Sequence, residues 1–252
     1  MPVAHSVRAH CTASLAFLSV AASSLSSRSQ RLSRRVAVIG GGSGGVIAAR
    51  FLKRAGHRPV VFEAGSTFGG VWADAPTNSV VYKNLQTNLP TVVMQSPDLD
   101  FEAGLPSYIT KPQLGRYIVR YADAFGVSPL TRFGAAVSSV SPVCDADGKA
   151  RWRVQWTSDG ATHADEEFDC VVVANGHYEE PYKPEIPGQA EWVEADPSGR
   201  AVVHSREYFE PSEFADQSVL VVGGRSSGVD IARELRGSAS WVYVATRARA
   251  PP

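Results

Sequence analysis

Three glycines at a fixed spacing, Gly40-x-Gly42-x-x-Gly45, are the first feature of this 252-residue sequence that could do chemistry. A glycine turn between a strand and a helix can bind phosphate with backbone N–H groups and the positive end of the helix. Gly40 would permit the tight turn, Gly42 would let a pyrophosphate approach the backbone, and Gly45 would let the helix pack close to the strand. Ser43 opens the helix, so we expect it beside the same phosphates.

The residues around this turn predict a strand–helix–strand (βαβ) unit. The apolar run Val36–Ile39 is typical of a buried parallel strand, and Val60–Phe62 would form a second one. The helix between them should face the sheet with Val46, Ala49, Phe51 and Leu52. Glu63 closes the second strand. A carboxylate there accepts hydrogen bonds from ribose hydroxyls and repels a 2′-phosphate, which favours FAD or NAD over NADP.

A second unit of the same kind begins at the apolar run Val219–Val222 and continues into the glycine-rich turn Gly223–Gly228. Arg225 replaces the middle glycine of this turn. After the next strand the second unit has no acid and offers Arg247 instead, and a guanidinium can bind a 2′-phosphate through two hydrogen bonds. We therefore expect NADPH rather than NADH here, bound by Gly223, Ser226, Ser227, Gly228 and Arg247.

The residues between the two units predict further elements. Thr110 and Gln113 form a capping-box pattern that starts a helix ending before Gly126. From Thr131 to Asp169, short alternating strands with glycine turns indicate a β-meander. The segment Phe168–Tyr178 is expected to be one buried strand that ends in a glycine turn.

Composition excludes several classes of function. Lysine plus arginine and aspartate plus glutamate each number 25, and no basic stripe suggests a nucleic-acid partner. No apolar run approaches the ~20 residues that span a bilayer. The three cysteines, Cys11, Cys144 and Cys170, are too widely spaced to form a disulfide framework or a metal site. No pattern in the sequence specifies an oligomeric state.

The first 34 residues differ from the rest of the chain because they are rich in Ser, Ala and Arg and contain no acid. This composition predicts a transit peptide for a plastid or mitochondrion. If the segment has no such role, we expect the protein in the cytoplasm. A secretory signal, a disordered tail and a mis-assigned start are the alternatives.

The stretch from Arg35 to Trp72 resembles the FAD-binding segment of flavin-containing monooxygenases. Glu63 and the following Gly69-Gly70-Val71-Trp72 match the E-x5-G-G-x-W pattern of that family. The resemblance implies FAD as the cofactor, with Glu63 on its ribose and with Gly70 and Trp72 at the same site.

Two further segments are similar to this family, most closely to its plant-type S-oxygenating members. Tyr82–Pro90 resembles the segment that carries an asparagine just before the flavin's reactive edge, and Thr87–Pro90 matches that segment, which implies that Asn88 is the catalytic amide. Val173–Tyr178 matches the strand end V-x-N-G-H-Y and implies that Asn175 and Gly176 lie at the flavin nucleotide. His177 belongs to this motif, and we interpret it as structural rather than catalytic.

A third motif of the family, F-x-G-x3-H-x3-[YF], is matched only in its second half. His204 and Tyr208 fit, whereas Gly199 is five residues before His204 instead of four and Ser198 replaces the phenylalanine.

The expected fold is α/β: a Rossmann-like FAD-binding domain with a β-meander insertion, plus a partial second Rossmann-like NADPH-binding domain. The expected boundaries are 1–34 for the leader, 35–180 for the FAD-binding domain and 181–252 for the NADPH-binding part, with a proline-rich linker at 181–187. Members of the family continue for about as long again, so the chain is expected to be a fragment.

The resemblance implies an FAD- and NADPH-dependent monooxygenase that oxygenates a soft nucleophile, an amine nitrogen or a thioether sulfur, with O2 through a flavin hydroperoxide. The cofactor carries this chemistry, so no nucleophile triad, carboxylate pair or metal cluster is needed. One alternative is a non-catalytic nucleotide-binding remnant. The other, a flavin-dependent NADPH reductase of the disulfide type, would need a close cysteine pair that the sequence lacks.

Overall fold

The computed structural model describes residues 33–73, 81–144, 148–158, 160–163, 165–178, 180–197 and 199–247. The predicted targeting segment lies outside the described residues, except for its last two positions. Ser198 of the partly matched motif also lies outside them.

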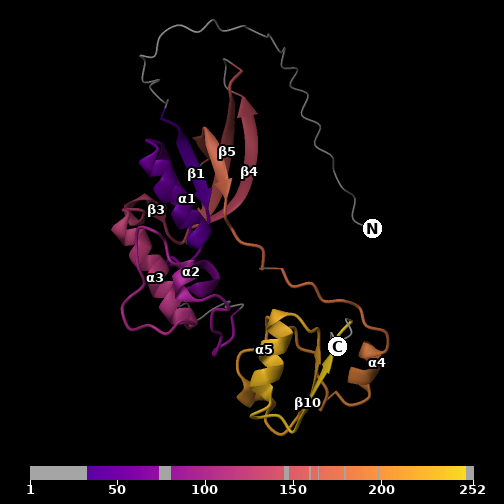
Figure 1. Ribbon diagram of the computed structural model, residues 1–252. Helices are drawn as coiled ribbons and strands as arrows, with labels where there is room; N and C mark the ends of the chain where they lie inside the picture. The colour runs from indigo at the N-terminus through magenta and orange to yellow at the C-terminus, as the bar shows by residue number, and fades with distance from the viewer. Residues whose placement is uncertain are drawn as a thin grey trace, which may run out of the picture. The chain divides into compact units, whose positions relative to one another are not determined.

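The first sheet is parallel and has the strand order β3-β2-β1-β8 (Figure 1). Its strands are β1 (Arg35–Ile39), β2 (Arg58–Phe62), β3 (Thr131–Arg132) and β8 (Cys170–Val173). Ile39 pairs with both Phe62 and Val173, so the carboxyl ends of the three longer strands meet at one edge. This edge is where an open α/β sheet binds its ligand.

Helix α1 (Ser43–Arg54) connects β1 to β2, as the apolar pattern predicts. Val46 and Ala49 are buried against Val38 and Val61 of the strands. The prediction that Phe51 faces the sheet is wrong, because its side chain is 49% exposed. At 3.6 residues per turn, Phe51 falls outside the stripe defined by Val46 and Ala49.

Helix α3 (Lys111–Ala124) lies against α1 in the same core. The predicted capping box is confirmed, since Thr110 N–H donates to Gln113 Oε1 at 2.8 Å. Ile118, Tyr121 and Ala122 are the buried face of this helix in that core. Residues 81–110, the described stretch before α3, contain the short helix α2 (Thr91–Met94) and isolated bridges.

The predicted β-meander is confirmed as an antiparallel sheet in which β5 pairs with three other strands. Val154 and Trp156 of β5 pack with Phe62 and Phe168, which joins the meander to the first sheet. The strands are β4 (Ala136–Cys144), β5 (Ala150–Ser158), β6 (Ala161–Thr162) and β7 (Glu166–Phe168).

The prediction of one buried strand over Phe168–Tyr178 is wrong. The chain leaves the meander with Phe168 in β7 and enters the parallel sheet with Cys170 in β8. Asp169 makes the switch: its carboxylate accepts the Arg35 N–H at 2.8 Å, and its own N–H donates to the Arg35 carbonyl at 2.9 Å. Strand β8 has only β1 as a described neighbour, and Val173 is 70% exposed.

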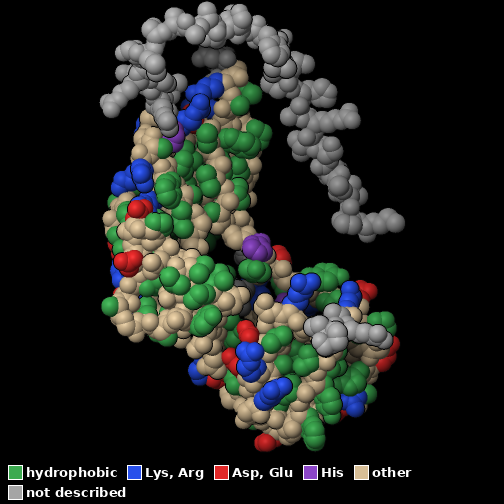
Figure 2. Space-filling model, viewed as in Figure 1, with side chains coloured by type: hydrophobic (Ala, Val, Ile, Leu, Met, Phe, Trp, Pro, Cys, Tyr) green, Lys and Arg blue, Asp and Glu red, His purple; other side chains and the backbone are tan. Residues whose placement is uncertain are grey.

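The second strand–helix–strand unit contains β9 (Ser218–Val222), α5 (Ser226–Leu235) and β10 (Trp241–Ala245), preceded by the short helix α4 (Gln189–Glu194). Strands β9 and β10 pair in parallel. Helix α5 covers one face of this sheet, where Val219, Val221 and Val242 pack around its Ile231 and Leu235. The side chains on the other face are exposed: Leu220, Val222, Trp241 and Tyr243. Figure 2 shows that hydrophobic side chains reach the surface of the C-terminal part of the chain.

Candidate functional site

The first glycine turn joins β1 to α1 at the ligand-binding edge of the sheet. Gly40 has φ +106°, which favours glycine, and its N–H donates to the Phe62 carbonyl at 2.8 Å. A Cβ on Gly45 would lie 1.9 Å from the Gly40 carbonyl oxygen, so only glycine lets α1 start this close to the turn. The turn therefore has the geometry that the sequence predicts for Gly40 and Gly45.

Glu63 is directed at this turn from the end of β2. Its carboxylate accepts the N–H of Gly41 at 2.5 Å and the N–H of Gly65 at 2.6 Å. A carboxylate has about four lone-pair positions, so two backbone donors leave acceptor capacity for further hydroxyl groups. The arrangement fixes Glu63 beside the glycine turn.

The Gly69–Trp72 segment forms a second turn over the first. Gly69 and Gly70 both have positive φ, +131° and +57°, and the N–H of Gly69 donates to the Gly41 carbonyl at 3.1 Å. A Cβ on Gly42 would lie 3.7 Å from the Gly70 Cα, an ordinary van der Waals contact. Packing within the protein thus does not require glycine at position 42. A methyl group there would lie between the Gly40–Gly45 turn and the Gly69–Trp72 turn.

The end of β8 completes the group. The Ala174 N–H donates to the Ile39 carbonyl at 2.8 Å, and a Cβ on Gly40 would lie 2.4 Å from the Ala174 carbonyl oxygen. Asn175 and Gly176 follow directly, both exposed, and Gly176 has φ +79°. The His177 ring lies 4.0 Å from that of Tyr178.

The second glycine turn repeats the geometry of the first. Gly223 has φ +117° and donates to the Ala245 carbonyl at 2.8 Å, as Gly40 does to Phe62. A Cβ on Gly228 would lie 2.0 Å from the Gly223 carbonyl oxygen. Ser226 and Ser227 form the first turn of α5 and are exposed. Thr246 occupies the place after β10 that Glu63 has after β2, with Arg247 exposed one residue later.

Asn88 lies in a loop that is bound to the start of α3. Thr87 donates its N–H to the Ile109 carbonyl at 2.9 Å and accepts the Ile109 N–H with Oγ1 at 3.1 Å, while the Asn88 side chain is exposed. Helix α3 in turn contacts the Gly69–Trp72 turn, since a Cβ on Gly115 would lie 2.5 Å from the Trp72 carbonyl oxygen. No described hydrogen bond joins Asn88 directly to the glycine turn, so α3 is the link between them.

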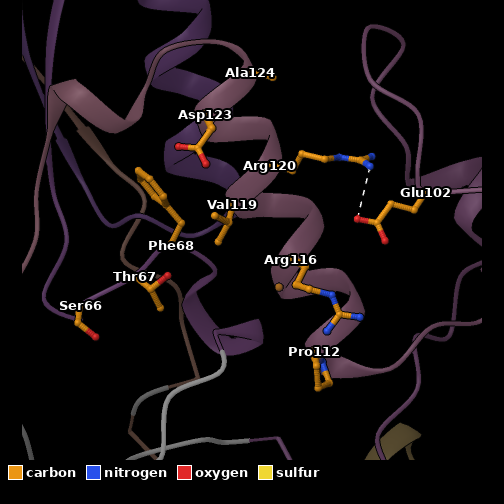
Figure 3. Close-up of a pocket in the computed structure, with 11 residues that line it drawn as sticks. Ser66, Thr67, Phe68, Glu102, Pro112, Arg116, Val119, Arg120, Asp123 and Ala124 are labelled. Carbon is orange, nitrogen blue, oxygen red and sulfur yellow. Dashed lines mark ion pairs between the residues drawn. The ribbon is translucent and has the colours of Figure 1, made fainter.

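A cavity of about 900 Å³ lies along α3 but contains none of the predicted site residues. Phe68 and Val119 lie side by side at its wall, and Arg120 forms an ion pair with Glu102 at 3.6 Å (Figure 3). Because a dinucleotide binds along backbone N–H groups, the converging turns identify the candidate site better than this cavity does.

Comparisons with known proteins agree with this geometry. The Flavin-binding monooxygenase-like family matches residues 33–250. The chain belongs to this family. It is 37% identical over 243 residues to Flavin-containing monooxygenase FMO GS-OX-like 2 of Arabidopsis thaliana, covering 87% of this chain and 50% of that protein. The chain thus spans about half the length of the curated relatives it matches.

Solved structures show the same relationship. The chain superposes on the S-allyl-L-cysteine S-oxygenase of Allium sativum with a TM-score of 0.76 and 34% identity, covering 88% of this chain and 53% of that one. The bacillithiol disulfide reductase of Bacillus cereus matches at 24% identity with a TM-score of 0.65, which shows a shared fold alone.

The described residues fit the flavin that the family binds. The first unit presents a glycine turn at a helix start, a carboxylate beside it and a second glycine turn over it, with no side chain between Gly42 and Gly70. These features suit a pyrophosphate and a ribose. In the described part of the chain, no group of three His, Cys, Asp or Glu side chains could hold a metal, and no helix is long and apolar enough to cross a bilayer.

The sequence reasoning missed two groups of residues. The first centres on Arg50, which is only 7% exposed, donates to Tyr121 Oη at 2.6 Å and lies 3.4 Å from the Phe125 ring centroid. It braces α1 against α3. Arg50 lies within the apolar pattern of the helix, and an arginine at such a position indicates that an acidic partner is needed, here Asp98.

The second missed group consists of Asp230 and Glu234, two carboxylates that bind buried tyrosines. Tyr82 donates to Asp230 Oδ2 at 3.1 Å, and Tyr208 donates to Glu234 Oε2 at 2.8 Å. Burial raises the pKa of both phenols, and the neighbouring carboxylates raise it further. The sequence signal for these contacts was the spacing of Asp230 and Glu234, which lie four residues apart on the helix after the second glycine turn.

Proposed function

We propose that this chain supplies the FAD- and NADPH-binding parts of a monooxygenase that oxygenates a soft nucleophile with O2. The convergence of Gly40–Gly45, Glu63, Gly69–Trp72 and the β8 end at one sheet edge is the observation that carries the proposal. When bound, FAD supplies the redox and oxygen chemistry. Thioether sulfur is the first substrate class to test, in view of the 34% identity to an S-oxygenase, and amine nitrogen is the second.

The residues of the first unit have separate proposed roles. Gly40, Gly42, Ser43 and Gly45 hold the pyrophosphate at the start of α1, and Glu63 accepts hydrogen bonds from the ribose. Gly70, Trp72, Asn175 and Gly176 line the flavin nucleotide. Asn88 is proposed as the catalytic amide at the flavin's reactive edge.

The second unit is proposed to bind NADPH. Gly223, Ser226, Ser227 and Gly228 would hold its pyrophosphate, and the repeat of the first turn's geometry supports this assignment. Arg247 would pair with the 2′-phosphate. No acid occupies the place equivalent to Glu63, so no charge repels that phosphate.

The test of the FAD site compares two glycine-to-alanine variants. Gly42→Ala places a methyl group between the two turns without a clash, whereas a Cβ on Gly44 meets nothing within 4 Å. We expect Gly42→Ala to weaken FAD binding at least tenfold, measured by flavin fluorescence titration, and Gly44→Ala to bind as the parent does. Equal binding by the parent and Gly42→Ala would overturn the site assignment.

The test of the NADPH site is cofactor preference. Arg247→Ala removes the proposed partner of the 2′-phosphate, so we expect the affinity for NADP+ to fall about tenfold and that for NAD+ to stay unchanged. Substrate-stimulated consumption of NADPH and O2 by the flavin-loaded chain supports the monooxygenase. A chain that binds both nucleotides but consumes neither NADPH nor O2 supports the non-catalytic alternative.

A further inference from the structure

The five residues Val81–Leu85, here called the strap, pack against the second unit although they belong to the N-terminal half of the sequence. Tyr82 is 6% exposed and lies in a cluster with Tyr208, Ile231 and Leu235. Leu85 packs at the edge of the same cluster. The strap is therefore part of the hydrophobic core under α5.

Polar contacts attach the strap to the same unit. The Lys83 N–H donates to the Phe209 carbonyl at 2.9 Å, and its ammonium pairs with Glu210 at 2.5 Å. The Tyr82 hydroxyl donates to Asp230, which lies on α5 one turn after Ser226. A phenol bonded to a carboxylate is a directional, charge-assisted contact, so it fixes the rotation and position of the helix more closely than apolar packing alone.

The Tyr82 and Tyr208 rings stand at 65° with centroids 5.7 Å apart. Tyr208 binds Glu234, one turn further along α5 than Asp230. Each tyrosine thus holds one of two carboxylates on the same helix face, and both rings lie in the hydrophobic cluster with Ile231 and Leu235 of α5.

The next residues of the chain are attached elsewhere. Gln86 forms a bridge with Thr110 at the start of α3, and Thr87 makes two hydrogen bonds with Ile109. The change of partner falls between Leu85 and Gln86. Asn88 follows two residues after Gln86, so Tyr82, which contacts α5, is six positions before the proposed catalytic residue.

We propose that Tyr82 is a positioning residue that couples nucleotide binding at the start of α5 to the Asn88 loop. Through its hydrogen bond to Asp230 it holds α5, and through the strap it connects that helix to Gln86 and Thr87. The inference rests on the proposed function for its consequence, because α5 would carry NADPH and Asn88 would face the flavin. The contact itself does not depend on either nucleotide.

Amide hydrogen exchange on the full chain tests the coupling. Tyr82→Phe keeps the ring and removes only the hydroxyl, and Tyr243→Phe is the matched control because Tyr243 is 57% exposed. Without nucleotide, we expect Tyr82→Phe to speed exchange about fivefold in both α5 and residues 86–91, the factor expected for one lost hydrogen bond. Exchange in α1 should stay as in the parent.

Addition of NADP+ gives the second measurement. In the parent, NADP+ should slow exchange in residues 86–91, and in Tyr82→Phe it should slow exchange in α5 alone. If the parent binds no NADP+, the proposed function of the second unit is wrong. The exchange rates without nucleotide would still show whether the strap couples α5 to residues 86–91. Faster exchange confined to α5, or no change in either segment, would overturn the inference. If Tyr82→Phe does not fold, Asp230→Asn provides a second variant with the same expected result, because it weakens the same hydrogen bond from its other partner.

Discussion

The glycines of the two turns do different physical work at the scale of single residues. Gly45 and Gly228 are required because a Cβ would lie 1.9 and 2.0 Å from a backbone oxygen of their own turn. Gly42 has no such neighbour, and Arg225 takes its place in the second turn without a clash being forced on the backbone. The motif therefore combines residues needed for folding with Gly42, which packing does not require and which we propose is needed for the ligand.

Gly45→Ala should consequently destabilise the protein even without nucleotide. The turn must open to move the Gly40 carbonyl, and overpacking of this kind costs about 1–3 kcal/mol or more. Urea unfolding of the apoprotein measures the effect. Gly44→Ala is the control, because it has open space and should be neutral or stabilising by up to about 1 kcal/mol. Equal stability of Gly45→Ala and the parent would contradict the packing role.

Much of the local structure could be predicted from the sequence because it depends on residues close in the chain. The glycine turns, the helix start at Thr110 and the meander strands are of this kind. The break at Asp169 could not be predicted, since it depends on Arg35, which is 134 positions away. The buried environment of Arg50 and Tyr82 likewise comes from partners on distant elements, which periodicity within one segment does not reveal.

At the scale of elements, the junction between the meander and the first sheet is held by charges. Glu166 of β7 accepts from Arg132 Nη1 at 2.6 Å and from Arg35, while Asp169 accepts the Arg35 N–H. Burial alone would raise the pKa of Glu166, but these two arginines outweigh it and lower the pKa from its usual 4.5. The Arg35 N–H also lowers the pKa of Asp169.

These lowered pKa values predict a loss of stability in acid. A carboxyl whose pKa is lower when folded stabilises the native state above its unfolded pKa, and this contribution disappears as pH falls toward the folded pKa. Glu166→Gln should therefore reduce the free energy of unfolding by about 1–2 kcal/mol at pH 7. The difference from the parent should shrink below about pH 4.5, the usual value of this carboxyl.

Chemical denaturation at pH 7 and at pH 3 measures this difference. Asp165→Asn is the control, because its ion pair with Arg153 at 3.5 Å is largely exposed and should contribute less than about 1 kcal/mol at either pH. A Glu166→Gln effect of the same size at both pH values would show that the side chain acts through shape rather than charge.

At the scale of the whole molecule, the described second unit is a two-stranded sheet covered by a helix on one face only. Leu220 and Tyr243 are directly opposite each other on its other face and are 60% and 57% exposed. An exposed apolar sheet face favours association with other molecules. The second unit is therefore expected to control the solubility of the chain.

Replacing the pair by opposite charges should test this expectation without unfolding the unit. In the variant Leu220→Glu with Tyr243→Lys, the new side chains remain in water and lie beside each other on the two parallel strands, where their opposite charges attract. Light scattering of the purified chain should then decrease at equal concentration. The same charges at Val219 and Val242, which also pair but lie under α5, should instead unfold the unit, because taking two charges out of water is costly even when they pair. If scattering is unchanged in the first variant, association of the chain depends on another surface.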